Sequence, residues 1–163
     1  MRVLGLDPGT ATTGYGVVEQ RNSRLYHVAH GVITTPAHTP FEERLIQIYD
    51  ETCALIQQHR PDAVGLEKIY FKQNVTTGIS VAQARGVLAL SVAQSSLPIR
   101  ELSPAEVKTG VVGYGKATKR QVQEMVKVLL NLDAIPKPDD AADALAIAIC
   151  TLHAGRLGNA IQA

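Results

Sequence analysis

The sequence of 163 residues predicts one α/β domain, residues 1–163, whose sheet contains both antiparallel and parallel strands. Three short apolar strands with tight turns between them open the chain, which is typical of an antiparallel meander. A helical segment then separates the third strand from the fourth, which favours a fourth strand parallel to the first. The last helical segment is apolar nearly all round, so we expect it to be buried against the sheet.

The first strand, Arg2 to Leu6, ends at Asp7 because Pro8-Gly9 forms a turn. The next segments are predicted, in order, as strand 13–18, strand 25–34, helix 40–59 and strand 63–66. Apolar residues recur at helical spacing in that helix, at Leu45, Tyr49, Cys53 and Ile56. Glu67 follows the fourth strand directly.

The second half begins with a loop, 68–75, and a long helix over 77–95 that is rich in small residues. Residues 99–102 are predicted as a fifth strand. Two capping boxes then mark helix starts, one from Ser103 to Glu106 and one from Thr118 to Gln121. The last helix is predicted to begin near Pro138-Asp139.

Four acidic residues are predicted to converge at one edge of this sheet. Asp7 and Glu67 end strands predicted to be parallel neighbours, and the carboxyl ends of such strands carry ligand groups in open α/β sheets. Asp140 and Asp143 are three residues apart, so they project from one helix face. Asp139 and Asp140 could simply cap the helix. Asp143 lies beyond the cap on an otherwise apolar face, where an unpaired carboxylate costs several kcal/mol.

Such a cluster predicts a site for hard divalent cations, because close carboxylates repel one another unless a cation neutralises them. Ligands that are all oxygen favour Mg²⁺, with Mn²⁺ as a substitute, over zinc. Two such ions about 4 Å apart catalyse phosphodiester cleavage in other enzymes. Setting aside these four of the 15 acidic residues leaves 16 basic against 11 acidic ones. A mildly basic surface around an acidic site suits a polyanionic substrate.

Other motifs are weaker. The segment 110–116 fits a phosphate-binding loop up to Lys116, but Ala117 stands where a serine or threonine should hold Mg²⁺. The five histidines show no metal-ligand spacing. Cys53 and Cys150 fall in apolar helical patterns and are expected to be reduced core residues of a cytoplasmic protein. We see no secretion signal and no membrane-spanning segment.

Several segments form a joint pattern: Leu4-Gly-Leu-Asp7-Pro-Gly-Thr10, Thr13-Gly-Tyr-Gly16, Glu67 after a strand, Gln83-Ala-Arg-Gly86, Val111-Val-Gly113 and Asp140-Ala-Ala-Asp143-Ala-Leu-Ala-Ile147. Together they resemble the RuvC family of Holliday-junction resolvases over essentially the whole chain. The resemblance implies an RNase H-like fold, a five-stranded mixed sheet with helices on both faces. It also implies a homodimer that works with the RuvAB branch-migration complex.

Carried over by position, Asp7, Glu67, Asp140 and Asp143 match the metal-binding acids of that family. Tyr70 falls where the family has an aromatic residue thought to stack in the opened four-way junction, although a tyrosine there departs mildly from its phenylalanine. Lys108 and Lys119 match basic residues placed near the DNA phosphate. We also expect DNA contacts from three further residues, Lys72, Lys116 and Arg120.

The predicted function is therefore a metal-dependent endonuclease that resolves Holliday junctions by paired cuts during recombination and repair. One alternative is a related nuclease that acts on structured RNA, and another is a junction-binding module without catalysis. Sugar kinases and actin-like ATPases also open with a Gly-x-Asp-x-Gly-Thr strand and turn, but they need a second such lobe. From the sequence alone, the apolar residues Val81, Ala84, Val87, Leu88 and Val92 of the long helix 77–95 fit a dimer contact and an internal core helix equally well. The family resemblance favours the dimer contact.

Overall fold

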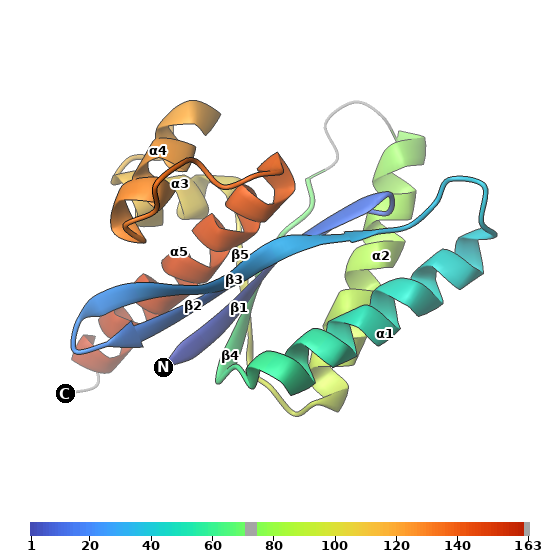
Figure 1. The fold of residues 1–163 in the computed structure, drawn as a ribbon, viewed down its shortest axis with the longest axis horizontal. Coiled ribbons are helices and arrows are strands. Elements are labelled where there is room, and N and C mark those ends of the chain that lie inside the picture. The colour runs from blue at the N-terminus through green and yellow to red at the C-terminus, as the bar shows by residue number, and fades with distance from the viewer. Residues whose placement is uncertain (71–74, 162–163) are drawn as a thin grey trace.

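The computed structural model describes residues 1–70 and 75–161, with the side chains of 75 and 155–161 left out. Figure 1 shows these residues as a sheet with helices on both sides. The elements are β1 (Arg2–Asp7), β2 (Thr12–Arg21), β3 (Arg24–Thr34), α1 (Phe41–His59), β4 (Ala63–Glu67), α2 (Val75–Gln94), β5 (Ile99–Leu102), α3 (Pro104–Val112), α4 (Lys119–Leu129) and α5 (Asp139–Ile161).

The five strands form one mixed sheet in the order β3-β2-β1-β4-β5. β1 pairs with β2 and β2 with β3 in antiparallel fashion, as the predicted meander requires. β1 pairs with β4, and β4 with β5, in parallel. Leu6 of β1 lies opposite Leu66 of β4. Asp7 and Glu67 therefore leave the sheet side by side, at the same edge, as the sequence predicts.

Local sequence signals account for most element boundaries. Ser103 and Thr118 both cap their helices through reciprocal hydrogen bonds, with Glu106 and Gln121 as the respective partners. α1 ends at His59, and its C-cap residue Arg60 adopts the left-handed conformation just before Pro61. The differences from prediction are small: β2 continues to Arg21, and the described α2 begins two residues earlier than expected.

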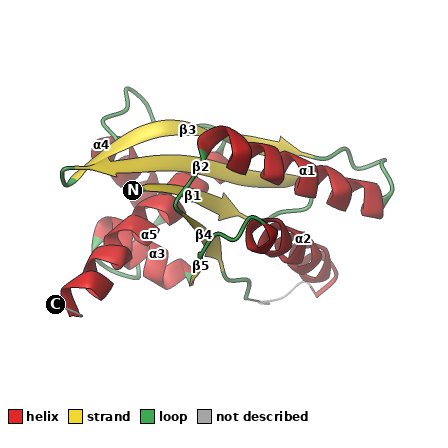
Figure 2. Ribbon diagram, turned by 90° about the horizontal axis from the view of Figure 1, so that it is seen from below, coloured by secondary structure: helices red, strands yellow, loops and turns green. Residues whose placement is uncertain are grey.

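Two apolar cores lie on opposite faces of the sheet. One is built with α3, α4 and α5 and includes Val3 and Val18 from the strands. The other is built with α1 and α2 and includes Leu4 and Val17. Neighbouring residues of one strand point to opposite faces, so this alternation assigns the helices to two layers. Figure 2 shows the same division after a quarter turn, with α1 and α2 apart from α3 and α5.

Glycines in the sheet allow α5 to lie against it at backbone contact distance. A Cβ atom added to Gly5 would come within 2.1 Å of the Ala144 carbonyl oxygen, and one at Gly14 within 2.0 Å of the Asp140 carbonyl oxygen. Gly16 and Gly65 face the same helix with similar clearance. Because Gly14 lies directly opposite Asp7 in the β1–β2 register, this contact brings the first turn of α5 to the end of β1. None of the described helices is long and apolar enough to span a membrane.

We expect Gly14→Ala to push the first turn of α5 away from the sheet, because backbone atoms leave no space for the added methyl group. The free energy of unfolding should fall by about 1–3 kcal/mol, as overpacked sites do. Urea unfolding measures this loss. Gly115→Ala is the control, because its new Cβ would meet no atom closer than 3.5 Å. Equal stability of the two variants would contradict close packing at Gly14.

Candidate active site

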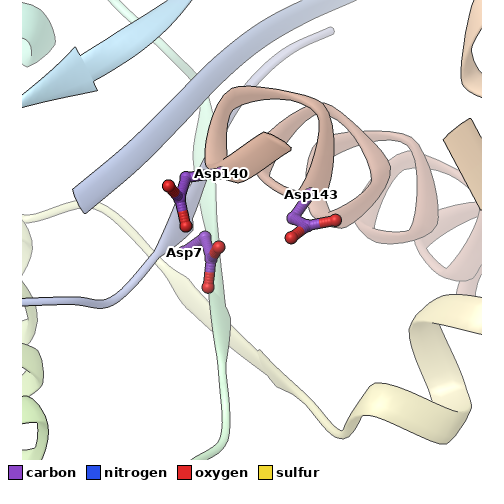
Figure 3. Close-up of side chains that lie close together, drawn as sticks. All are labelled: Asp7, Asp140 and Asp143. Carbon is purple, nitrogen blue, oxygen red and sulfur yellow. The ribbon is translucent and has the colours of Figure 1, made fainter. Parts of the chain in front are cut away.

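Three carboxylates converge where β1 ends and α5 begins. Asp7 comes from β1, and Asp140 and Asp143 come from successive turns of α5. One carboxylate oxygen from each lies within 4.8 Å of the other two, and Figure 3 shows the three side chains turned toward one another. The three-residue spacing of the two α5 acids makes this possible, since both then lie on the helix face that meets the sheet.

Glu67 adjoins this cluster from the end of β4, but it lies outside the set of three mutually close carboxylates. Burial and the charge of Asp143 raise the pKa of Glu67, and a hydrogen bond with Asp7 opposes this shift. The structure therefore brings all four predicted acids to one edge of the sheet. Three carboxylates lie close together, and the fourth, Glu67, lies beside Asp7.

Burial first, and like charge second, disfavour the ionised form of acids in this cluster. Burial, reinforced by the charges of Glu67 and Asp143, raises the pKa of Asp7 to about 8. Burial also raises the pKa of Asp143, although its ion pair with Lys119 opposes the shift. Carboxyls held this close favour protonation unless positive charge is supplied.

The described residues supply that charge mainly through Lys119, the first residue of α4. Its Nζ lies 3.1 Å from Asp143 and 3.7 Å from Asp139. Asp139 also accepts a hydrogen bond from Lys137 at 3.2 Å, so it belongs to the rim and not to the group of three. The family resemblance leads us to expect Lys119 near a DNA phosphate, and in this structure it neutralises an acid of the cluster.

The donor set fits a hard divalent cation. All three close ligands are carboxylate oxygens, which Mg²⁺, Mn²⁺ and Ca²⁺ prefer over nitrogen or sulfur donors. A pocket of about 260 Å³ opens beside them and is lined by Glu67, Lys108, Lys119 and Asp143, with apolar residues completing its wall. A bound cation would lower the pKa of these acids and relieve the repulsion between them.

Arg85 of α2 is hydrogen-bonded to the backbone at the end of β4. Its Nε donates a hydrogen bond of 3.0 Å to the backbone carbonyl of Glu67, and its guanidinium also pairs with Glu101 of β5. The Gln83-Ala-Arg-Gly86 segment carries part of the family resemblance, but sequence reasoning gave Arg85 no task. The available signal was an arginine in a helix otherwise rich in small and apolar residues.

A wider groove of about 730 Å³ continues from Glu67 to the residues after β4. Lys68, Ile69 and Tyr70 line it on one side and Lys108 on the other, so Lys108 borders both the groove and the pocket of the acids. The Tyr70 side chain is 57% exposed, which excludes a core role for it in this conformation. Lys68 was not among the predicted DNA contacts.

The other predicted DNA-binding residues have different surroundings. Arg120 is exposed and pairs with Glu124 at 2.6 Å, one turn along α4. Lys116 is exposed in the turn between α3 and α4. Lys72 lies outside the described residues. The structure therefore places Lys108, Lys119 and Tyr70 near the acids. Contact of Arg120 and Lys116 with DNA stays a prediction.

The structure also locates the phosphate-loop-like segment, two of the histidines and the two cysteines. Gly110 lies inside α3, where an added Cβ would meet the Cys150 sulfur at 2.5 Å, so no phosphate-binding loop forms. His27 and His30 contact each other at 2.7 Å on β3, away from any acid among the described residues that could complete a metal site. Cys53 and Cys150 are both free thiols.

Comparison with known proteins identifies the family. The profile described as crossover junction endodeoxyribonuclease RuvC matches residues 3–151. The chain belongs to the RuvC family. RuvC of Desulfitobacterium hafniense strain DCB-2 is 52% identical over 98% of this chain and 96% of its own length. RuvC of Chloroflexus aurantiacus is 53% identical over 92% of each chain.

Solved RuvC structures share the fold over nearly the whole chain. Thermus thermophilus RuvC in complex with a Holliday junction substrate is 31% identical, with a TM-score of 0.92 over 97% of this chain and 96% of that one. The yeast mitochondrial resolvase Ydc2, at 19% identity and a TM-score of 0.66, shares the fold alone. The expected RNase H-like fold is thereby confirmed, and the two-lobed ATPase alternative is excluded.

The raised pKa of Asp7 predicts how the stability of the cation-free protein depends on pH. Its carboxyl titrates near 3.8 when unfolded, but holds its proton up to about pH 8 when folded. This contribution to stability is complete below the lower value and is lost as the pH rises through the upper one. We expect Asp7→Asn to raise the free energy of unfolding near pH 9 by about 1–3 kcal/mol and to change it little near pH 4.

Urea unfolding in EDTA at the two pH values measures this difference. Asp139→Asn is the matched control, because a hydrogen bond with Lys137 lowers the pKa of Asp139. Its removal should give no stabilisation at high pH. An Asp7→Asn variant that is less stable than wild type near pH 9 would contradict the raised pKa.

Proposed function

We propose that this chain is a divalent-cation-dependent endonuclease that resolves four-way DNA junctions. The observation that carries the proposal is the convergence of Asp7, Asp140 and Asp143 in a chain of the RuvC family. The relatives are named crossover junction endodeoxyribonucleases, and one solved relative is described with a Holliday junction substrate. The acidic site beside half-buried and exposed lysines suits a phosphodiester substrate.

In this proposal Asp7, Asp140 and Asp143, with Glu67 beside them, hold Mg²⁺, for which Mn²⁺ would substitute. Divalent cations held there would supply Lewis acidity for activating a water and for neutralising the leaving oxygen. The residues of the chain orient the reacting groups: α5 fixes two carboxylates against β1, and Arg85 fixes the backbone that carries Glu67. Lys119, at the rim of the cluster, is suited to contact a phosphate oxygen.

Binding of the junction is proposed to use the groove beside the acids. Tyr70 is exposed at its border and could stack on an unpaired base, an interaction of about 1–3 kcal/mol. Lys68 and Lys108 line the same groove and add positive charge toward the phosphates. Lys72, Lys116 and Arg120 are proposed to extend this contact. We also infer, from family membership, a cytoplasmic protein that cooperates with the RuvAB motor.

The decisive experiment is cleavage of a synthetic four-way junction with and without Mg²⁺, mapped on all four strands. We expect Asp143→Asn to abolish cleavage, because it removes one ligand charge, and to leave junction binding intact or tighter, because it reduces repulsion of phosphates. Paired cuts on opposed strands are expected for wild type.

The matched control is Asp139→Asn, which changes an acid at the rim of the same helix start and should keep cleavage. Equal loss of cleavage in both variants would argue against a specific site. A structured RNA competitor separates the substrates: RNA that competes as well as the junction and is itself cut would favour the RNA nuclease. Junction binding by wild type without any cleavage would favour the non-catalytic module.

We further propose a homodimer, since a four-way junction has near two-fold symmetry and one chain has one acidic cluster. The contact residues suggested by the sequence were wrong in part. Ala84, Leu88 and Val92 are fully buried in the core with α1. The exposed side of α2 instead carries Ile79 and Leu90, each 52% exposed.

Gly86 lies between Ile79 and Leu90 on this exposed side, and an added Cβ there would meet nothing within 4 Å. Residues 79, 86 and 90 follow helical spacing, so they form one stripe with an open centre. Apolar residues around an exposed glycine allow a second helix to approach closely. The sequence could not distinguish this stripe from the core face, because α2 is apolar on several sides.

We expect Leu90→Glu to convert the dimer to monomers, because it places a charge within the proposed contact, next to Gly86. Sedimentation at micromolar concentration should change from about twice the 17.5 kDa chain mass to a single chain. Val128→Glu is the control, since Val128 of α4 is also exposed, at 69%, and lies on another helix. Wild type that stays monomeric on junction DNA, yet makes paired cuts, would contradict the dimer.

A further inference from the structure

Another pocket, separate from the two described beside the acids, is lined by the turn that follows Asp7. Its volume is about 440 Å³. Its lining joins the 9–12 turn to the start of α1 and the first turns of α2, through Gly9, Thr10, Ala11, Thr12, Phe41, Arg44, Thr77, Ser80 and Val81. Among the described residues of this lining, Arg44 is the charged one and none is a carboxylate.

Thr10 is the unusual member of the lining. Its side chain is more than nine-tenths buried, and its hydroxyl oxygen has no hydrogen-bond partner among the described residues. A buried hydroxyl without a partner is unfavourable, so this group needs an explanation, and a bound ligand would supply the missing hydrogen bond. The backbone carbonyl of Thr10, in contrast, has a partner: it accepts a hydrogen bond of 2.6 Å from the Thr35 hydroxyl.

Arg44 is held in place from its inner side. Its Nε donates to the Thr35 hydroxyl at 2.8 Å, and that hydroxyl in turn donates to the Thr10 carbonyl. This chain of hydrogen bonds fixes the guanidinium beside the turn. The structure records no acid within ion-pair distance of Arg44 among the described residues, whereas Arg2, Arg21, Arg85 and Arg120 each have one.

We propose that this pocket binds one backbone phosphate of the DNA strand that enters the acidic site. A guanidinium, several hydroxyl groups and the positive end of α2 together make an anion site. The described lining residues include no carboxylate, which favours an anion over a cation. Thr10 lies three residues beyond Asp7, so a phosphate held here would fix the strand close to the cleavage centre.

The proposal deepens the proposed nuclease function and rests on it. Its consequence is a separation of tasks within one turn: Asp7 contributes to the cation site, and Thr10 and Arg44 hold the substrate. Loss of the phosphate contact should therefore weaken binding of the junction and leave the rate at saturating junction unchanged.

The cleanest variant is Thr10→Val, which keeps the shape of the side chain and removes only the hydroxyl. Stability to urea should be unchanged or higher, because no hydrogen bond within the described protein is lost. Junction affinity should nevertheless fall about tenfold, the value of one hydrogen bond to a charged group. Reduced affinity without reduced stability is an effect that a purely structural Thr10 would not give.

Arg44→Gln provides the second measurement. Junction affinity should fall about tenfold or more, and the slope of its logarithm against the logarithm of salt concentration should decrease by about one. Arg24→Gln is the control. It also removes one positive charge, but Arg24 is exposed at the β2–β3 turn, away from the pocket. A junction with one phosphate near the cut replaced by methylphosphonate should bind Arg44→Gln and wild type equally.

The outcomes separate this proposal from the function on which it rests. A protein that neither binds nor cuts junctions would overturn the proposed function itself. Normal cleavage by wild type, with unchanged affinity in both Thr10→Val and Arg44→Gln, would overturn the phosphate pocket alone. Stabilisation by inorganic phosphate that Arg44→Gln abolishes, without any change in junction affinity, would assign the pocket to the free anion and also overturn the DNA contact.

Discussion

The site depends on one packing constraint, the contact of the α5 backbone with the glycines of the sheet. Gly5 and Gly14 leave no room for a side chain beneath the helix, so α5 lies against β1 and β2 at the closest distance available. Its first turn therefore reaches the end of β1, where Asp7 leaves the sheet. Apolar burial alone would hold the helix on this face, but it would not set the distance between carboxylates on two different elements.

That geometry has an electrostatic cost which the protein offsets only in part. Asp7 keeps its proton to about pH 8 because the surrounding charges are negative and the site is buried. Lys119 neutralises Asp143, and the capping box at Thr118 fixes the backbone at the start of α4 from which the lysine extends. The cluster thus has too little positive charge when no cation is bound, and we therefore expect it to reduce the stability of the cation-free protein at high pH.

The sequence could predict the sheet, both capping boxes and the convergence of the acids, because these follow from local patterns and from strand direction. It could not assign Arg85 or the pairing of Lys119, since both depend on distances between elements far apart in the chain. Three of the five suggested dimer-contact residues were assigned wrongly for a related reason. α2 is apolar on several sides, so periodicity does not distinguish Leu88, in the core, from Leu90, which is half exposed.

Lys119 connects the two parts of the proposed mechanism. In this structure its ammonium group lies 3.1 Å from Asp143. It therefore neutralises part of the negative charge that a bound cation would otherwise neutralise. Asp143 would be shared between Lys119 and a divalent cation held at the acids, so the two would compete for the same carboxylate. On the proposed function, cation binding would therefore free a lysine at the moment when a phosphate approaches the same rim. Cation and substrate would then favour each other's binding through one side chain, which is the reciprocal coupling that linkage requires.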